Sequence, residues 1–169
     1  MKGDRENCFL RVVVILCRGQ HLLLHRTPSK FGDSLDGKLS IGLIGFVKRE
    51  DRTLFATDNL GIQEAAERTL SEQLYMSYNV IKELSPVFDF YTTRCIVDVD
   101  DLKLENAIAA VVVFKCPMTK KFDELFSSLN TFEWHSRPTK INNSEQFDPW
   151  SRYMIETPIL ENILAECVE

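Results

Sequence analysis

The segment 61–76 constrains the fold most, because it is an amphipathic helical pattern placed between two groups of strand-like segments. Apolar residues recur at Ile62, Ala65, Ala66, Leu70 and Leu74, close to helical spacing. The strand-like segments, rich in apolar and β-branched residues, are 10–17, 21–25 and 39–47 before it and 87–91 and 107–115 after it. This mixed order predicts an α/β domain of the layered α+β kind, rather than a regular βαβ alternation.

The other segments predict how these elements are joined. Residues 18–20 form a tight turn that makes 10–17 and 21–25 a hairpin, and the polar stretches 27–38 and 48–59 are predicted loops. The segment 107–115 is nearly all apolar, which predicts a central strand. Downstream we expect a short amphipathic helix at 120–129, an extended piece at 131–135 and a terminal helix at 151–168, kinked or split at Pro158.

Composition limits the classes of function. A chain of 169 residues without repeats or linker-like segments predicts a single domain, 1–169. The net charge of -5 and the absence of a basic stripe argue against binding long nucleic acid. The N-terminus is too polar for a signal peptide, and the apolar runs are too short to span a bilayer. Five cysteines without a Cys-x-x-Cys pair indicate a reduced, cytoplasmic protein rather than a disulfide framework or a zinc site.

The segment 61–74, Gly-Ile-Gln-Glu-Ala-Ala-Glu-Arg-Thr-Leu-Ser-Glu-Gln-Leu, resembles the catalytic helix of the Nudix hydrolase superfamily. Its small, basic, apolar and acidic residues fall at the positions of the Nudix pattern: Ala65, Ala66, Arg68, Leu70, Glu72 and Leu74. Segments 22–27 and 40–47 are similar to two strands of that fold. Segment 147–152 is similar to a segment of predicted bacterial phosphoesterases and of isopentenyl-diphosphate isomerase. The resemblance implies a Nudix-type mixed sheet flanked by helices over nearly the whole chain.

The chain departs from the Nudix pattern at most of its metal-binding positions. The three acidic positions of the helix read Thr69, Glu72 and Gln73, and the first Glu of the pattern falls on Leu60. Gly45 and Arg68 are 23 positions apart, so the loop before the helix is nine residues longer than in the pattern. In an active member the acidic side chains share one helix face and hold Mg²⁺ or Mn²⁺ against substrate phosphates. Here two of three negative charges are missing, which predicts a weak cation site or none.

The remaining acidic residues supply the candidate catalytic and metal-binding residues. Glu72 is the main candidate ligand, and Glu105, just before the strand 107–115, is a candidate auxiliary ligand or base. Glu50 and Asp51 in the lengthened loop are further candidates. The alternative for Glu72 is structural, because Glu64, Arg68 and Glu72 have the spacing of a salt-bridge ladder on an exposed helix face.

Candidate substrate-binding residues come from the strands and the helix that match the family. Arg26 contacts a phosphate or caps a surface strand. Gly42 and Gly45 bring backbone close to a phosphate or mark close packing of strands. We expect Phe46 to pack in the core, with a stacking surface for a base as the alternative; Arg68 completes this set, and Trp150 is expected to anchor the terminal helix in the core.

The sequence favours a Nudix-fold protein that binds a nucleoside-diphosphate-type ligand, with hydrolysis weak or lost. The first alternative is an active Mg²⁺- or Mn²⁺-dependent pyrophosphohydrolase of a phosphoesterase kind. A prenyl-diphosphate isomerase is a distant one, because 39–47 lacks the Cys and His that such an enzyme carries there. The expected partner is a small phosphate-containing molecule, with a protein partner or a homodimer also open.

Overall fold

The computed structural model describes residues 10–26, 37–54, 60–87, 91–99, 102–136 and 144–167, with the backbone alone for 91–99 and 102–108. A sheet is formed by strands β1 (Leu10–Arg18), β2 (His21–Arg26), β3 (Leu39–Ser40), β4 (Leu43–Phe46), β5 (Ser85–Pro86), β6 (Tyr91–Val99), β7 (Leu102–Lys115) and β8 (Phe132–Ser136). The helices are α1 (Ile62–Leu74), α2 (Tyr78–Ile81), α3 (Lys120–Ser127), α4 (Pro149–Glu156) and α5 (Ile159–Cys167), with short 3₁₀ turns η1 (Arg49–Asp51) and η2 (Ser144–Gln146).

The middle of the sheet is a parallel pair, β1 and β7, with Leu10 opposite Ile108 and Cys17 opposite Lys115. The other edge of β1 is shared, because β2 pairs with its last residues and β4 pairs antiparallel with Arg11 to Val14. The other edge of β7 pairs with β6 and β5. The central position predicted for 107–115 is therefore confirmed, and the strand begins earlier, at Leu102.

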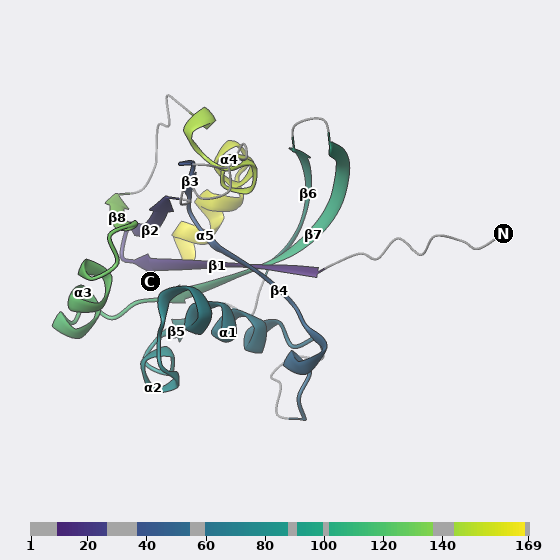
Figure 1. The fold of residues 1–169 in the computed structure, drawn as a ribbon. Helices are drawn as coiled ribbons and strands as arrows, with labels where there is room; N and C mark the ends of the chain where they lie inside the picture. The colour runs from purple at the N-terminus through teal and green to yellow at the C-terminus, as the bar shows by residue number, and fades with distance from the viewer. Residues whose placement is uncertain are drawn as a thin grey trace.

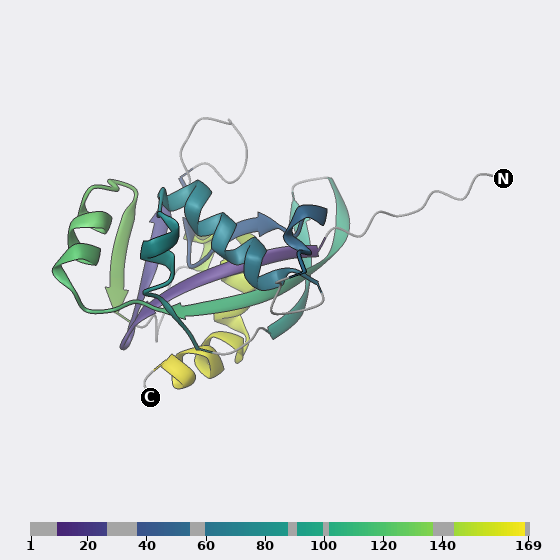
Figure 2. The same ribbon diagram turned by 90° about the horizontal axis from the view of Figure 1, so that it is seen from below.

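Helices cover both faces of the sheet, as Figures 1 and 2 show for α1 on one side and α4 and α5 on the other. Alternate residues of β1 serve the two faces: Val12, Val14 and Leu16 pack in a cluster with α1, and Val13 and Ile15 pack in a cluster with α4 and α5. This two-sided burial explains why β1 is apolar without alternation. The predicted layered α/β fold with a mixed sheet is confirmed.

The predicted strand 39–47 is divided into β3 and β4. β3 pairs with β2, whereas β4 pairs with β1, so the chain changes neighbours at Ile41 and Gly42. A Cβ atom on Gly42 would lie 2.6 Å from Val13 Cγ1, which makes glycine necessary at this crossing.

The C-terminal segment differs from its prediction mainly at its start. The split expected at Pro158 is present, because α4 ends at Glu156 and α5 begins at Ile159. The helix begins at Pro149 rather than at 151, since Asp148 caps it through the amides of Trp150 and Ser151.

Most of the predicted strand 87–91 lies outside the described residues, and β6 starts at Tyr91. Within the described part of the chain, no helix has the length and apolar content needed to cross a membrane.

Candidate functional site

Helix α1 starts where the lengthened loop meets it. Gly61 precedes the helix with φ +73°, and a Cβ there would lie 2.5 Å from the Asp51 carbonyl oxygen. A side chain would therefore be strained in backbone conformation and would also collide with the η1 turn. Glycine at 61 lets residues 48–51 pack directly against the first turn of the helix.

Thr69 stands at the first acidic position of the Nudix helix, and the structure buries it. The side chain is 1% exposed, and its hydroxyl donates to the Ala65 carbonyl at 2.7 Å. Gly45 of β4 lies directly above it, since a Cβ on Gly45 would be 2.2 Å from Thr69 Oγ1. The position is thus part of the contact between α1 and β4 and offers no open ligand atom.

Gln73 and Arg68 together cap the outer edge of β4. Gln73 Nε2 donates to the Ile44 carbonyl at 2.8 Å, and Arg68 Nη2 donates to the Phe46 carbonyl at 2.6 Å. Carbonyls two apart on a strand are separated by about 6.7 Å, and five residues of helix rise about 7.5 Å, so the two spacings match. The helix face that carries metal ligands in the Nudix pattern here satisfies the hydrogen bonds of a strand edge.

Arg68 also ties the lengthened loop to the helix. Its Nε and Nη2 atoms donate to the two carboxylate oxygens of Asp51, both at 2.9 Å, and the Lys48 amide donates to the same carboxylate at 2.7 Å. Burial raises the pKa of Asp51, but the hydrogen bonds from Arg68 and Lys48 and the charge of Arg68 outweigh it and lower the pKa overall. Asp51 is therefore a buried, ionised partner of Arg68, and a role for it as a metal ligand stays a prediction.

Of the three Nudix metal-binding positions 69, 72 and 73, Glu72 is the one that keeps a carboxylate. Arg68 Nη1 lies 3.3 Å from both of its oxygens, and Lys48 Nζ lies 3.9 Å from Oε1. The i, i+4 ion pair considered from the sequence is present between Arg68 and Glu72. The hydrogen bonds that Arg68 donates to Asp51 and Glu72 raise the pKa of Arg68, so the guanidinium stays charged beside them.

The donor set does not fit the divalent cation that the Nudix resemblance implies. Mg²⁺ and Mn²⁺ bind carboxylate, carbonyl and water oxygens. Here the side-chain amide of Gln73 donates a hydrogen bond to the Ile44 carbonyl, and Glu72 already faces two cationic side chains. Among the side chains that the structure describes, no three His, Cys, Asp or Glu residues gather closely enough to hold a metal ion.

Two predicted site residues lie apart from this face. Glu105 pairs with Val97 on the β6–β7 hairpin, before the point where β1 joins β7 at Ile108, and its side chain is not among the described ones. Arg26 ends β2, and its Nη1 donates to the Gly37 carbonyl at 2.6 Å. This contact is of the capping kind considered for Arg26, while its contact with a phosphate stays a prediction.

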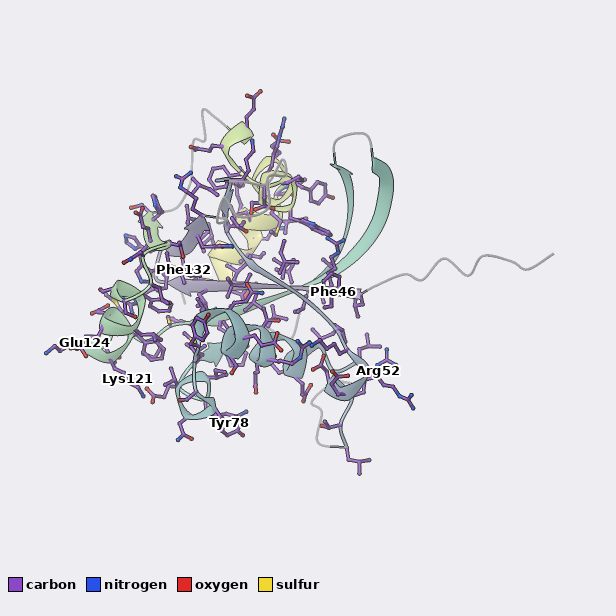
Figure 3. The ribbon with its side chains drawn as sticks, viewed as in Figure 1. Phe46, Arg52, Tyr78, Lys121, Glu124 and Phe132 are labelled. Carbon is purple, nitrogen blue, oxygen red and sulfur yellow. The ribbon has the colours of Figure 1, made fainter. Side chains whose placement is uncertain are left out.

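The segment 39–47, which carries Gly42, Gly45 and Phe46, is closely packed at both glycines. Gly42 faces Val13 and Gly45 faces Thr69, so both glycines make room for neighbouring side chains. Phe46 is 48% exposed, which corrects the expectation that it packs in the core. Its ring lies 5.4 Å from the Arg11 guanidinium, which lies 5.7 Å from the Trp150 ring. Figure 3 shows Phe46 where β4 runs beside β1, well away from Phe132 near α3.

A buried polar network, which sequence reasoning missed, joins α4 to the crossing between β3 and β4. Ser151 Oγ donates to Asp148 and accepts from the Ile41 amide at 2.9 Å, and Ser40 Oγ lies 3.4 Å from Ser151 Oγ. Ser40, Asp148 and Ser151 are each less than 5% exposed. Trp150 is buried beside them as expected. The Asp148-Pro149 pair was the signal in the sequence, because Asp before Pro is a helix-start pattern.

A small cavity lies between the diverging strands β2 and β4. It measures about 10 Å³, room for one water molecule, and is lined by Val14, Leu16, Leu23, His25, Gly42, Leu43 and Phe132. His25 stacks on Phe132 with ring centres 5.3 Å apart. Burial lowers the pKa of His25, although the charge of Asp148 opposes this, so His25 is neutral near pH 7. The cationic group at this end of β2 is therefore Arg26 and not His25.

Solved structures resemble this fold, although no protein-family model and no curated protein match the sequence. Tm1382, a protein assigned to the Nudix hydrolases, matches with a TM-score of 0.50 and 14% identity over 90% of this chain and 70% of its own.

A bifunctional NMN adenylyltransferase/ADP ribose pyrophosphatase from Francisella tularensis, complexed with AMP and a Mn ion, matches with a TM-score of 0.51 and 16% identity over 92% of this chain. A second structure of that bifunctional protein has a TM-score of 0.50 and 16% identity over 91% of this chain. The chain spans less than half of the bifunctional protein, 42% and 41% in the two cases. These matches show that the chain has the Nudix fold.

Proposed function

We propose that this chain binds a nucleoside-diphosphate-type ligand and hydrolyses it weakly or not at all. The observation that carries the proposal is the state of the α1 face. Thr69 is buried under Gly45, Gln73 donates to the Ile44 carbonyl, and Glu72 faces Arg68 and Lys48. Thr69 and Gln73 thus have structural contacts in place of open metal-ligating oxygens, and the exposed Glu72 carboxylate pairs with two cations.

The chemistry of hydrolysis in this fold depends on a divalent cation. A divalent ion neutralises charge on the phosphates and positions water. One exposed carboxylate with two cationic neighbours attracts such an ion poorly, because Arg68 and Lys48 repel it. The sequence by itself leaves open whether hydrolysis survives, and these contacts favour its loss.

The ligand half of the proposal rests on groups at the rim of the sheet. Phe46 presents half of its surface to solvent beside the Arg11 guanidinium, which suits an aromatic base with a nearby anion. The exposed end of Arg26 supplies a second cation for a phosphate. The ligand class itself comes from likeness of fold, since the Francisella protein was complexed with AMP.

Turnover and binding are measured on the same protein. We expect metal-dependent turnover of ADP-ribose or related nucleoside-diphosphate compounds with Mg²⁺ or Mn²⁺ to be weak or absent, and to be the same in wild type and in Glu72→Gln. We expect at least one compound to raise the thermal unfolding midpoint. At a concentration of 100 times its Kd, the compound should raise the free energy of unfolding by about 2.7 kcal/mol. Phe46→Ala and Arg26→Ala should reduce this shift.

Two results would contradict this function. Turnover in wild type that Glu72→Gln abolishes would establish the active hydrolase instead. No thermal shift with any compound would remove the small-molecule ligand and leave a protein partner as the alternative.

A gain-of-function variant tests the closed cation site directly. Gln73→Glu places a carboxylate oxygen against the Ile44 carbonyl oxygen, and two acceptors in contact repel unless a cation lies between them. We expect Gln73→Glu to lower the unfolding midpoint. We expect Mn²⁺ to raise the midpoint of this variant back toward the wild-type value and to leave the midpoint of wild type unchanged. Gln73→Leu is the matched control, because it also loses the hydrogen bond and should not respond to Mn²⁺. Equal Mn²⁺ responses in wild type and Gln73→Glu would mean that the wild-type site already holds the ion.

A further inference from the structure

Two cysteines from opposite ends of the chain meet inside the cluster under α4 and α5. Cys17 lies near the end of β1, and Cys167 is the last residue of α5. Both side chains are fully buried, with 0% exposure, and both belong to the same apolar cluster. Both are free thiols.

The Cys17 and Cys167 thiols share a hydrogen bond where α5 packs on β1. This hydrogen bond and burial raise the pKa of Cys17. The same bond lowers the pKa of Cys167 against the effect of burial, with help from the charge of Lys115 and against that of Glu166. Lys115 is placed there by the sheet, because it is the register partner of Cys17 on β7. The charge of Lys115 lowers the pKa of both thiols, so it favours a thiolate at this pair.

We propose that Cys17 and Cys167 form an oxidation site, at which a peroxide joins the two sulfurs in a disulfide that ties α5 to β1. The packing carries this proposal, since the two hydrogen-bonded thiols are buried in one cluster where α5 packs on β1, and no strand or helix has to change partners. The proposal is independent of the ligand site. In a reducing compartment the bond would be transient, present while peroxide is present.

The chemistry balances with one equivalent of hydrogen peroxide. The Cys167 thiolate attacks a peroxide oxygen, the O–O bond breaks, and one water leaves after protonation, which leaves a sulfenic acid on Cys167. The Cys17 sulfur then attacks the Cys167 sulfur, the S–O bond breaks, and a second water leaves. The two thiols lose two electrons and two protons in total, and the peroxide is reduced to two waters.

Peroxide reaches Cys167 through opening of the last turn of α5. Helix ends open at low free energy compared with central strands, and Cys167 is at such an end, whereas Cys17 lies in a central strand. Cys116 is a different case. It packs in the cluster under α1, on the other face of the sheet, and burial raises its pKa to about 12.

The test begins with the folded wild-type chain, reduced and then treated with hydrogen peroxide. We expect a mass loss of two hydrogen atoms, a cross-linked peptide pair that contains Cys17 and Cys167, and a rise in the unfolding midpoint that a thiol reductant reverses. Hydrogen exchange of the α5 amides should slow in the oxidised form. A cross-link that includes another cysteine, or oxygen added to Cys167 without a cross-link, would overturn the proposal.

Variants test the roles of the two sulfurs separately, so that the result does not depend on a single substitution. In Cys17→Ala we expect a sulfenic acid on Cys167 that a dimedone reagent captures, and no reversible rise in the midpoint. Cys116→Ala is the matched control, because it removes another buried thiol and should leave the disulfide intact. Loss of the disulfide in Cys116→Ala would contradict the pairing. If Cys17→Ala does not fold, the oxidised and reduced wild-type forms still decide the question.

Discussion

At the residue scale, Arg68 joins helix α1 to β4 and to the η1 turn, which come about 20 residues earlier in the chain. It binds Asp51 in the η1 turn, the Phe46 carbonyl on β4 and Glu72 on its own helix. Its place in the helix could be predicted from the sequence, because Arg68 is one of the positions that match the Nudix pattern. Its partner Asp51 could not, because it lies in a loop whose length departs from that pattern, and only the folded loop brings it to the helix.

The Asp51–Arg68 pair should contribute measurably to stability. Asp51→Asn removes the buried one of the two carboxylates that pair with Arg68, whose side chain is only 21% exposed, and leaves the exposed Glu72. We expect a loss of about 2–3 kcal/mol in urea unfolding, less than for a wholly buried pair. Glu50→Gln is the matched control, since Glu50 is exposed in the same turn and should change little. A similar loss in both variants would mean that the turn, and not the ion pair, is responsible.

The same pair sets a dependence on pH. The pKa of Asp51 is lower in the folded chain than its ordinary value of 3.8. The stability from this pair is therefore fully present above that value and is lost as the pH falls through the folded pKa. We expect wild type to lose stability below about pH 4 more steeply than Asp51→Asn, as followed by urea unfolding between pH 3 and pH 7. Parallel curves for the two proteins would contradict this assignment.

At the element scale, β4 and α1 fit each other through small residues and edge contacts. Gly45 lies on Thr69, and two α1 side chains cap the β4 carbonyls. The helix and the strands could be predicted from periodicity, since their apolar residues have the spacing of each element. The division of 39–47 into β3 and β4 could not, because it depends on which neighbours each half finds in the sheet.

A double-mutant cycle measures the contact between these two elements. Gly45→Ala adds a Cβ 2.2 Å from Thr69 Oγ1, and we expect a loss of about 1–3 kcal/mol. Thr69→Ala removes that oxygen, so the double variant should regain part of the loss, with a coupling of about 1 kcal/mol. Unfolding midpoints of the four proteins give the coupling. Strict additivity would show that the loss in Gly45→Ala comes from its contact with Val12 instead.

At the scale of the whole molecule, stability is concentrated where β1 and β7 pair. Residues 12–16 of β1 and 111–114 of β7 are at most 2% exposed, with helices on both faces. By contrast, residues 102–107 of β7 have β6 as their strand partner among the described residues, since β1 joins only at Ile108. A two-stranded ribbon is marginal on its own.

Hydrogen exchange should reproduce this division. We expect the amides of 111–114 to exchange only on global unfolding, and those of 96–106 to exchange about 100-fold faster or more through local opening. The measurement is native-state exchange followed by mass spectrometry or NMR. Equal protection along all of β7 would show that another contact covers the hairpin.

The sequence by itself determined the class of fold and the departures at the cation site, because both depend on residue types at fixed spacings. Apolar periodicity marks strands and helices wherever the chain goes, and Thr69 and Gln73 cannot supply carboxylates in any fold. Only the tertiary structure decided what those residues do instead. A hydrogen bond from Gln73 to Ile44, the burial of Asp51 against Arg68, and the contact of Cys17 with Cys167 all join segments that are distant in the chain. Such contacts depend on how the sheet is ordered, which local spacing does not encode.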